Sequence, residues 1–272
     1  MSAARNAGLA VATGDYVLFL DGDDWVSPSM VATVMTSAVG APDLIHWKFK
    51  QVDESGQSTG VFDSDWTLAW PDRGPDMLTC LLNGSCRWLW IGATVWKVDF
   101  LRERDLTFTV GCATAEDSEF MWSALMDVET ALFIDEAMTS YLLRVGSVSQ
   151  SSDLRLLDGC LAYFRLADKL QSARGADWGR EVDSLVDRAI DRYFYVIDRT
   201  ARVGNMNRLF RQIEMRAPGV TSLVHQSLAR RRSGGAHLPK RQLLFLLLPV
   251  AGPHISLARR YSSRLGRGGA VT

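Results

Sequence analysis

Residues 16–24, YVLFLDGDD, are the stretch of this 272-residue chain that decides its fold. The first five residues form an apolar run that is too short for a typical helix, so we expect a fully buried β-strand. Asp21, Asp23 and Asp24 follow where that strand ends, and strand ends are where open α/β sheets form their ligand crevice. Gly22 permits a sharp turn that brings the carboxylates together. The stretch therefore predicts a buried strand that leads into an acidic loop.

Carboxylates gathered in this way suit a hard divalent cation, Mn²⁺ or Mg²⁺, that keeps positions open for phosphate oxygens. The alternative is a solvated Asp-Gly turn that caps the next helix, because Asp is common in turns and at helix N-caps. The flanking residues favour the cation site. A helix-like segment, ARNAGLA at 4–10, and a turn, ATGD at 12–15, precede the strand, and Trp25 and Pro28 follow the loop.

As a whole, residues 4–28 closely resemble the inverting family 2 glycosyltransferases of bacteria. The resemblance implies an α/β fold with a GT-A-like sheet, that of the nucleotide-diphospho-sugar transferases, followed by a C-terminal helical region. It also implies that the acidic loop is the DxD motif of the family. In that motif Asp21 and Asp23 would bind the metal ion and the diphosphate of a nucleotide-sugar donor, with a UDP-sugar as the expected donor, and Asp24 would support the loop.

A second motif, AEDSEF, occupies residues 115–120 and resembles the family's Glu-Asp motif, at the start of a helix behind the acceptor site. An inverting transfer needs a carboxylate that takes the proton from the acceptor hydroxyl. The metal ion offsets charge on the departing diphosphate. We expect Asp117 to be the catalytic base, supported by Glu116; the alternative is that the helix dipole favours acids there. Ala115 departs from the glycine that family members often carry at this place.

A weaker resemblance lies at residues 141–149, YLLRVGSVS, which match a phrase that many family members carry after the last strand. Arg144 would meet donor phosphate there, because a guanidinium suits phosphate oxygens. The alternative is a surface arginine on an edge strand. The residues expected to bind the donor or to support its site are Arg5, Asn6, Asp21, Asp23, Asp24 and Arg144.

Three tryptophans near residue 90 have two interpretations. Trp88 and Trp90 could either stack on sugar rings or pack as wall residues, whereas Trp96 is expected in the core, because tryptophan buries a large area.

The resemblance implies a metal-dependent enzyme that moves a sugar, with inversion, to a hydroxyl of a cell-envelope glycan, a polyol phosphate or a lipid-linked acceptor. Family members also carry two βα units before the Ala-Arg-Asn phrase, whereas Ala4 lies three residues after Met1 here. We therefore expect an N-terminally truncated sheet: a fragment, a misplaced start, or a chain that another polypeptide completes. The alternative function is a non-catalytic, membrane-associated binding or assembly protein.

The composition, with 47% hydrophobic and 22% charged residues and a net charge of −1, is that of a globular protein and excludes a disordered one. Residues 1–150 are expected to form the partial catalytic domain. Residues 151–232 are expected to form a helical appendage, because their apolar residues recur at helical spacing. Residues 233–272 form a basic and apolar tail, and no Asp or Glu follows Glu214.

The tail is expected to lie at an anionic membrane surface. Its apolar run at 243–248, LLFLLL, is far shorter than the ~20 residues that span a bilayer, but cations flank it. A buried helix is the second interpretation. Nucleic-acid binding is the third, and since no nucleic-acid motif accompanies the charge we expect no such partner.

The four cysteines show no Cys-x-x-Cys spacing and the four histidines do not cluster with them. We expect neither a zinc site nor a disulfide framework. We also expect no signal peptide and a cytoplasmic protein that is peripheral at the inner face of the plasma membrane.

Overall fold

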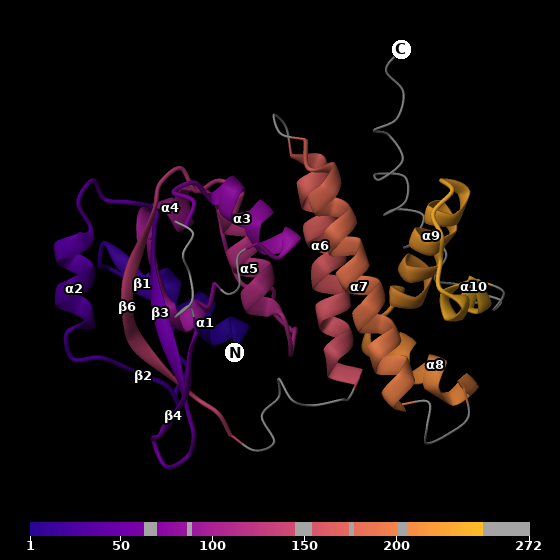
Figure 1. The fold of residues 1–272 in the computed structure, drawn as a ribbon, viewed down its shortest axis with the longest axis horizontal. Coiled ribbons are helices and arrows are strands. Elements are labelled where there is room, and N and C mark those ends of the chain that lie inside the picture. Colours follow the sequence, from indigo (N-terminus) through magenta and orange to yellow (C-terminus); the bar gives the residue numbers. More distant parts are fainter. Residues whose placement is uncertain (63–69, 86–88, 145–153, 174–176, 201–205, 247–272) are drawn as a thin grey trace. The chain divides into compact units, whose positions relative to one another are not determined.

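The computed structural model describes residues 1–62, 70–85, 89–144, 154–173, 177–200 and 206–246 (Figure 1). The chain divides into two compact units. The sheet unit comprises Met1–Cys112 and Glu116–Gln150, and the helical unit comprises Ala113–Ala115 and Ser151–Thr272.

A mixed sheet of six strands forms the centre of the sheet unit, in the order β1-β5-β3-β6-β2, with β4 paired to β3. Strands β3 and β6 are parallel and form the longest pairing, while the other pairs are antiparallel. The strands are β1 (Tyr16–Leu18), β2 (Trp25–Val26), β3 (Leu44–Val52), β4 (Ser58–Phe62), β5 (Thr94–Lys97) and β6 (Ala131–Leu142).

The helices of the sheet unit are α1 (Ser2–Val11), α2 (Met30–Ser37), α3 (Gly74–Asn83), α4 (Val98–Glu103) and α5 (Glu116–Leu125). Gly74 begins α3 where the chain passes very close to the end of α5. A Cβ atom at this position would lie 2.2 Å from the carbonyl oxygen of Leu125 and 2.6 Å from Cβ of Val128. Glycine is therefore required at the contact between these two helices.

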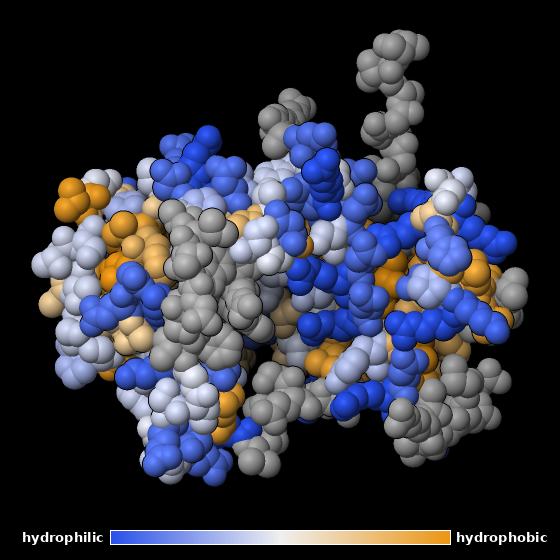
Figure 2. All heavy atoms as spheres, in the orientation of Figure 1, coloured by the Kyte–Doolittle hydropathy of each residue, from blue (hydrophilic) through white to orange (hydrophobic). Residues whose placement is uncertain are grey.

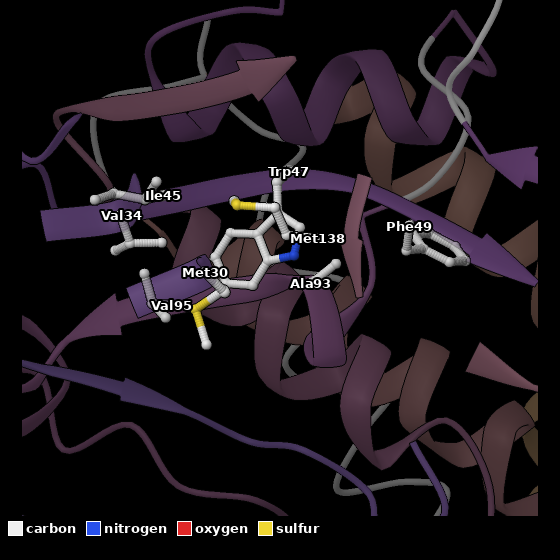
Figure 3. Packing of buried hydrophobic residues seen from close by; sticks show 8 residues of the cluster. All are labelled: Met30, Val34, Ile45, Trp47, Phe49, Ala93, Val95 and Met138. Atoms are coloured by element: carbon white, nitrogen blue, oxygen red, sulfur yellow. The ribbon is translucent and has the colours of Figure 1, made fainter. Parts of the chain in front are cut away.

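A hydrophobic core lies between α2 and the sheet, and Figure 3 shows its central residues around the indole of Trp47. The indole N–H of Trp47 donates to the hydroxyl of Thr139 at 2.8 Å, and that hydroxyl donates to the carbonyl oxygen of Gly92 at 2.9 Å. The buried polar atoms of this core are thus satisfied. Its members are Met30, Val34, Ile45, Trp47, Phe49, Ala93, Val95 and Met138.

The apolar run at residues 16–20 differs from its prediction. It forms strand β1, but β1 is an edge strand and its three residues are half-buried rather than fully buried. Phe19, just beyond β1, is buried against Phe108 and Phe120, whereas 39% of Leu20 is exposed. An apolar run predicts a strand but carries no information on which strands will lie beside it.

The helical unit contains the helices expected after residue 150: α6 (Leu157–Ser172), α7 (Gly179–Thr200), α8 (Met206–Arg216), α9 (Val220–Ser233) and α10 (Lys240–Leu246). Helices α6 and α7 pack side by side (Figure 1). The surface of α7 that faces the viewer in Figure 2 is mostly hydrophilic, and its other face supplies core residues such as Leu185 and Tyr193.

The first part of the apolar tail packs into the helical unit. Phe245 of α10 is buried, with its ring 5.6 Å from that of Tyr193 and 5.4 Å from that of Phe194 in α7. The rest of the tail, residues 247–272, lies outside the described residues. Within the described part of the chain, every helix is too short or too polar to cross a membrane.

The cysteine prediction is wrong in one respect. Cys80 in α3 is disulfide-bonded, whereas Cys112 and Cys160 take part in no disulfide. Burial raises the pKa of the Cys160 thiol to about 12. Sequence spacing identifies chelating motifs, but a disulfide depends on which Cβ atoms the fold brings together.

We expect His46 in β3 to make the protein sensitive to acid. Its imidazole is buried against the rings of Trp70 and Phe133, and burial lowers its pKa from 6.5 to about 3. As the pH is lowered, His46 therefore becomes protonated near pH 6.5 in the unfolded chain but only near pH 3 in the folded chain. Stability from this group is complete above pH 6.5 and falls as the pH is lowered. The expected loss between pH 7.5 and pH 5 is about 2 kcal/mol.

Urea unfolding of the wild type and of His46→Leu at both pH values measures this loss. The difference in pH dependence between the two proteins isolates the histidine from the carboxylates, whatever the absolute stability of the variant. An identical pH dependence in both proteins would contradict the assignment.

Candidate active site

The acidic loop, residues 21–24, is tied to the end of β6 through Asp24. The carboxylate of Asp24 accepts a hydrogen bond from the backbone N–H of Leu142 at 2.9 Å. Burial, together with the charges of Asp23 and Asp21, raises the pKa of Asp24 to about 6. Its second oxygen is buried and has no hydrogen-bond partner among the residues that the structure describes. Asp24 therefore holds the loop in place, as expected for a supporting residue.

Arg5 in α1 joins the acidic loop to the second motif. Its guanidinium donates to Oδ1 of Asp21 at 2.7 Å and to Oε1 of Glu116 at 3.3 Å. The guanidinium also lies over the ring of Phe108, 5.2 Å from its centroid. The side chains of Arg5 and Glu116 are both at most 10% exposed. One buried cation thus holds together two motifs that are far apart in the sequence.

Asn6, the next residue of α1, binds the backbone on both sides of Phe108. Its amide nitrogen donates to the carbonyl oxygen of Phe108 at 2.9 Å, and its amide oxygen accepts the N–H of the same residue at 2.8 Å. Asn6 therefore holds the segment that leads to the second motif against α1. The structure uses the side chains of Arg5 and Asn6 for these internal contacts, and their contact with a donor stays a prediction.

Glu116 and Asp117 are the first two residues of α5. Burial raises the pKa of Glu116, the adjacent Asp117 adds to the rise, and Arg5 partly opposes it. Asp117 is half-buried, and its Oδ1 accepts the backbone N–H of Ser118 at 2.7 Å. Of the two carboxylates, Glu116 is the one that Arg5 holds. This geometry suits a supporting role for Glu116 and a base role for Asp117.

Ala115, directly before this pair, has a φ of +65°. This left-handed conformation has an unfavourable energy for a residue with a Cβ atom, whereas glycine adopts it without steric strain. The backbone therefore gives a physical reason for the glycine that family members often carry here, and Ala115 adopts the same turn at an energetic cost.

Arg144 lies beyond β6 with Nε 3.5 Å from Oδ2 of Asp23, and its side chain is 54% exposed. It therefore reaches the acidic loop, while residues 145–149 of its motif lie outside the described residues. The core prediction for Trp96 is confirmed, since it is 0% exposed. Trp90 is half-buried between Phe49 and Tyr141, at ring distances of 4.8 and 5.1 Å, which favours a wall position. Trp88 lies outside the described residues.

The acidic loop offers a metal ion two carboxylates, those of Asp21 and Asp23. Within the described residues, no three His, Cys, Asp or Glu side chains gather in a way that could hold a metal ion by themselves. This donor set fits Mg²⁺ or Mn²⁺ in the manner of nucleotide-binding sites, where one or two carboxylates share the ion with substrate phosphates and water.

We expect Arg5→Met to destabilise the sheet unit by about 3 kcal/mol, because it leaves the buried carboxylate of Glu116 and the half-buried carboxylate of Asp21 without their cation. Urea unfolding measures the loss. In the double variant Arg5→Met/Asp21→Asn part of the stability should return, since one stranded charge is gone. Strictly additive effects of the two substitutions would show that Arg5 and Asp21 do not interact.

We expect Ala115→Gly to raise the free energy of unfolding by up to about 1 kcal/mol, because glycine relieves the left-handed strain. The matched control is Gly111→Ala, at a position with φ of +91° and open space around its Cβ, which should be destabilising. Thermal unfolding of both variants tests the pair. A destabilised Ala115→Gly would mean that backbone strain is not the dominant effect at that residue.

Comparison with known proteins finds similar sequences and similar folds. Residues 1–55 match the family model of glycosyl transferase family 2. The chain is 35% identical over 163 residues to the uncharacterized glycosyltransferase YibD of Escherichia coli K12, covering 55% of this chain and 44% of YibD. It is 20% identical over 193 residues to the putative glycosyltransferase EpsH of Bacillus subtilis, covering 68% of this chain and 55% of EpsH. The chain spans about half the length of these curated relatives.

The fold is similar to that of S. aureus TarS residues 1–349, crystallised in complex with UDP-GlcNAc. The TM-score is 0.61 at 18% identity, and the match covers 84% of this chain and 63% of that one. The mixed α/β sheet and the helical region after it thus agree with the predicted fold class. The chain is therefore similar to glycosyl transferase family 2 over residues 1–55 and to TarS in its fold, which is GT-A-like.

Proposed function

We propose that this chain carries the catalytic residues of a metal-dependent, inverting glycosyltransferase. The enzyme would move a sugar from a nucleotide-sugar to a hydroxyl of a cell-envelope glycan, a polyol phosphate or a lipid-linked acceptor. The observation that carries the proposal is the pair of contacts made by Arg5. It links Asp21 of the acidic loop to Glu116 of the second motif, so that the two motifs belong to one site.

The acidic loop is the donor side of this site. Asp21 and Asp23 would hold Mn²⁺ or Mg²⁺ against the diphosphate, and the bound ion would offset charge on the departing group. Arg144, which forms an ion pair with Asp23, would meet the same phosphates. A UDP-sugar is the proposed donor, and TarS, a neighbour in fold, was crystallised with UDP-GlcNAc and with UDP.

The start of α5 is the acceptor side. The Asp117 carboxylate takes the proton of the acceptor hydroxyl as its oxygen forms a bond to the anomeric carbon. The bond from that carbon to the diphosphate breaks on the opposite face, so the configuration inverts. Glu116 keeps its contact with Arg5 and holds the end of the helix in place.

Calorimetric titration of the full chain with UDP-GlcNAc and Mn²⁺ tests donor binding, and release of UDP in the presence of glycan and polyol-phosphate acceptors tests transfer. We expect donor binding that depends on the metal ion. Absence of binding at millimolar donor would overturn the proposal for this chain and would favour a non-catalytic binding or assembly role.

Two variants separate the proposed roles. Asp117→Asn should keep donor binding and lose transfer by at least 100-fold, the low end of the contribution of a general base. Asp23→Ala should weaken binding of UDP-GlcNAc in the presence of Mn²⁺, with little change in its absence. Full turnover by Asp117→Asn would remove that residue as the base, and unchanged binding by Asp23→Ala would remove the metal role of the loop.

We also propose that the basic C-terminal end brings the protein to the inner face of the plasma membrane. Residues 206–246 contain the single acid Glu214 against eight Arg and Lys residues. Three of these cations, Arg216, Arg231 and Arg241, are already paired with carboxylates of the helical unit. The remaining attraction would come from the other cations and from the tail, at about 1 kcal/mol for each well-placed charge.

Since Phe245 packs into the helical unit, the informative truncation is after Leu246. We expect the full chain to sediment with vesicles that contain 30% phosphatidylserine and the truncated chain to bind them more weakly, both effects fading at high salt. Neutral vesicles are the control. Equal binding of both chains to anionic vesicles would refute a role for the tail.

A further inference from the structure

Helix α2 of the sheet unit is apolar on two sides. Met30 and Val34 point into the hydrophobic core beside Trp47 and are at most 6% exposed (Figure 3). The outer side of the helix carries Val31 and Met35, which are 65% and 53% exposed. A helix at the surface of a globular protein normally has polar and charged residues on its outer side, and a helix that is apolar all round is normally buried. The outer side of α2 therefore has the composition of a covered surface.

This outer side also lacks charge. No Asp, Glu, Lys, Arg or His occurs from Trp25 to Pro42, a segment that contains the whole helix. The hydroxyl of Thr36 donates to the backbone of the helix itself, to the carbonyl oxygens of Ala32 at 2.9 Å and Thr33 at 3.0 Å. A partner that covers this side would therefore desolvate no charged side chain of α2 and would leave the Thr36 hydroxyl satisfied.

The exposed residues of α2 form a ridge beside a shallower row. Val31, Met35 and Val39, which lies just beyond the helix and is 87% exposed, follow one another at a spacing of four residues. Ala32 and Thr36, one position further along, are smaller and are also exposed. When two helices pack, a ridge of side chains spaced four apart fits into the groove beside the same ridge of the other helix. The surface is thus complementary to a copy of itself.

We propose that the outer side of α2 is a dimer interface, where it packs against α2 of a second copy of this chain about a two-fold axis. Both copies use the same patch in a two-fold interface, and a patch without charge brings no like charges together when it meets itself. Met35, in the middle of the ridge, lies close to its counterpart in the second copy. The dimer is independent of the proposed catalytic function.

A membrane surface fits this patch less well than a second copy does. Helices that lie on an anionic membrane carry Lys and Arg on their polar side, and such a membrane repels acids. The segment 25–42 has no cation, and Asp23, Asp24 and Asp43 flank it. In a dimer these acids stay apart, because helices that pack through ridges spaced four apart cross at about −50° and their ends diverge.

The interface is small, so the dimer is weak. A standard interface involves about 20–30 residues of each partner, whereas α2 has eight residues. We expect a dissociation constant on the order of 100 µM. Sedimentation velocity of the full chain from about 1 µM to about 1 mM, with a reductant present to exclude cross-linking by cysteines, covers this range. A chain that stays monomeric at every concentration would overturn the proposal.

Charge substitutions at Met35 test the two-fold contact. Met35→Glu places like charges together and should weaken association at least about tenfold. The matched control is Met215→Glu, because Met215 of α8 is 76% exposed and belongs to the helical unit, and it should associate like the wild type. An equimolar mixture of Met35→Glu and Met35→Lys pairs opposite charges and should recover the association. Unchanged association of Met35→Glu, or no recovery in the mixture, would overturn the proposed contact.

An apolar substitution separates a shaped contact from general hydrophobic association. Ala32→Met enlarges the apolar surface but fills the groove that the ridge enters, so we expect it to weaken the dimer. Thermal unfolding at low concentration should show the wild-type Tm for this variant and for both Met35 variants, because the substituted side chains are exposed. Association of Ala32→Met that equals or exceeds that of the wild type would overturn the packing of ridge into groove.

Discussion

The contact between Arg5 and two carboxylates is the constraint on which the site depends. Asp21 and Glu116 come from a loop after an edge strand and from the start of a helix, and without a cation between them their charges would repel. The guanidinium is suited to this position because it is planar, permanently charged and able to donate in two directions at once. Helix α1 is held beside both motifs by this arginine and by Asn6.

The site carries an excess of negative charge on its donor side. Asp24 is half-buried and has a raised pKa, and Asp21 and Asp23 add to the field that raises it. Arg5 and Arg144 offset part of this charge through Asp21 and Asp23, and a divalent ion bound as proposed above would offset more of it.

Local patterns predicted the parts of the structure that depend on neighbours in the sequence. The acidic loop and the helices after residue 150 follow from composition and periodicity over short windows. The helix that begins at Glu116 was implied by the resemblance of residues 115–120 to a family motif. The edge position of β1, the disulfide of Cys80 and the burial of Asp158 depend on residues far away in the chain. A short stretch of sequence does not show which distant residues it will contact. The left-handed φ of Ala115 was signalled only by its departure from the glycine of related motifs.

The close approach at Gly74 places a restriction on sequence as well as on structure. A methyl group there would collide with the carbonyl of Leu125, so any larger residue would have to push away the end of the helix whose beginning carries Glu116 and Asp117. The residue at position 74 is thus restricted to glycine, although it is not one of the proposed site residues. Some distantly related sequences will share the acidic motif of residues 21–24. We expect those with a glycine at the position of Gly74 to hold α5 in the same position, and those with a larger residue there to hold it differently.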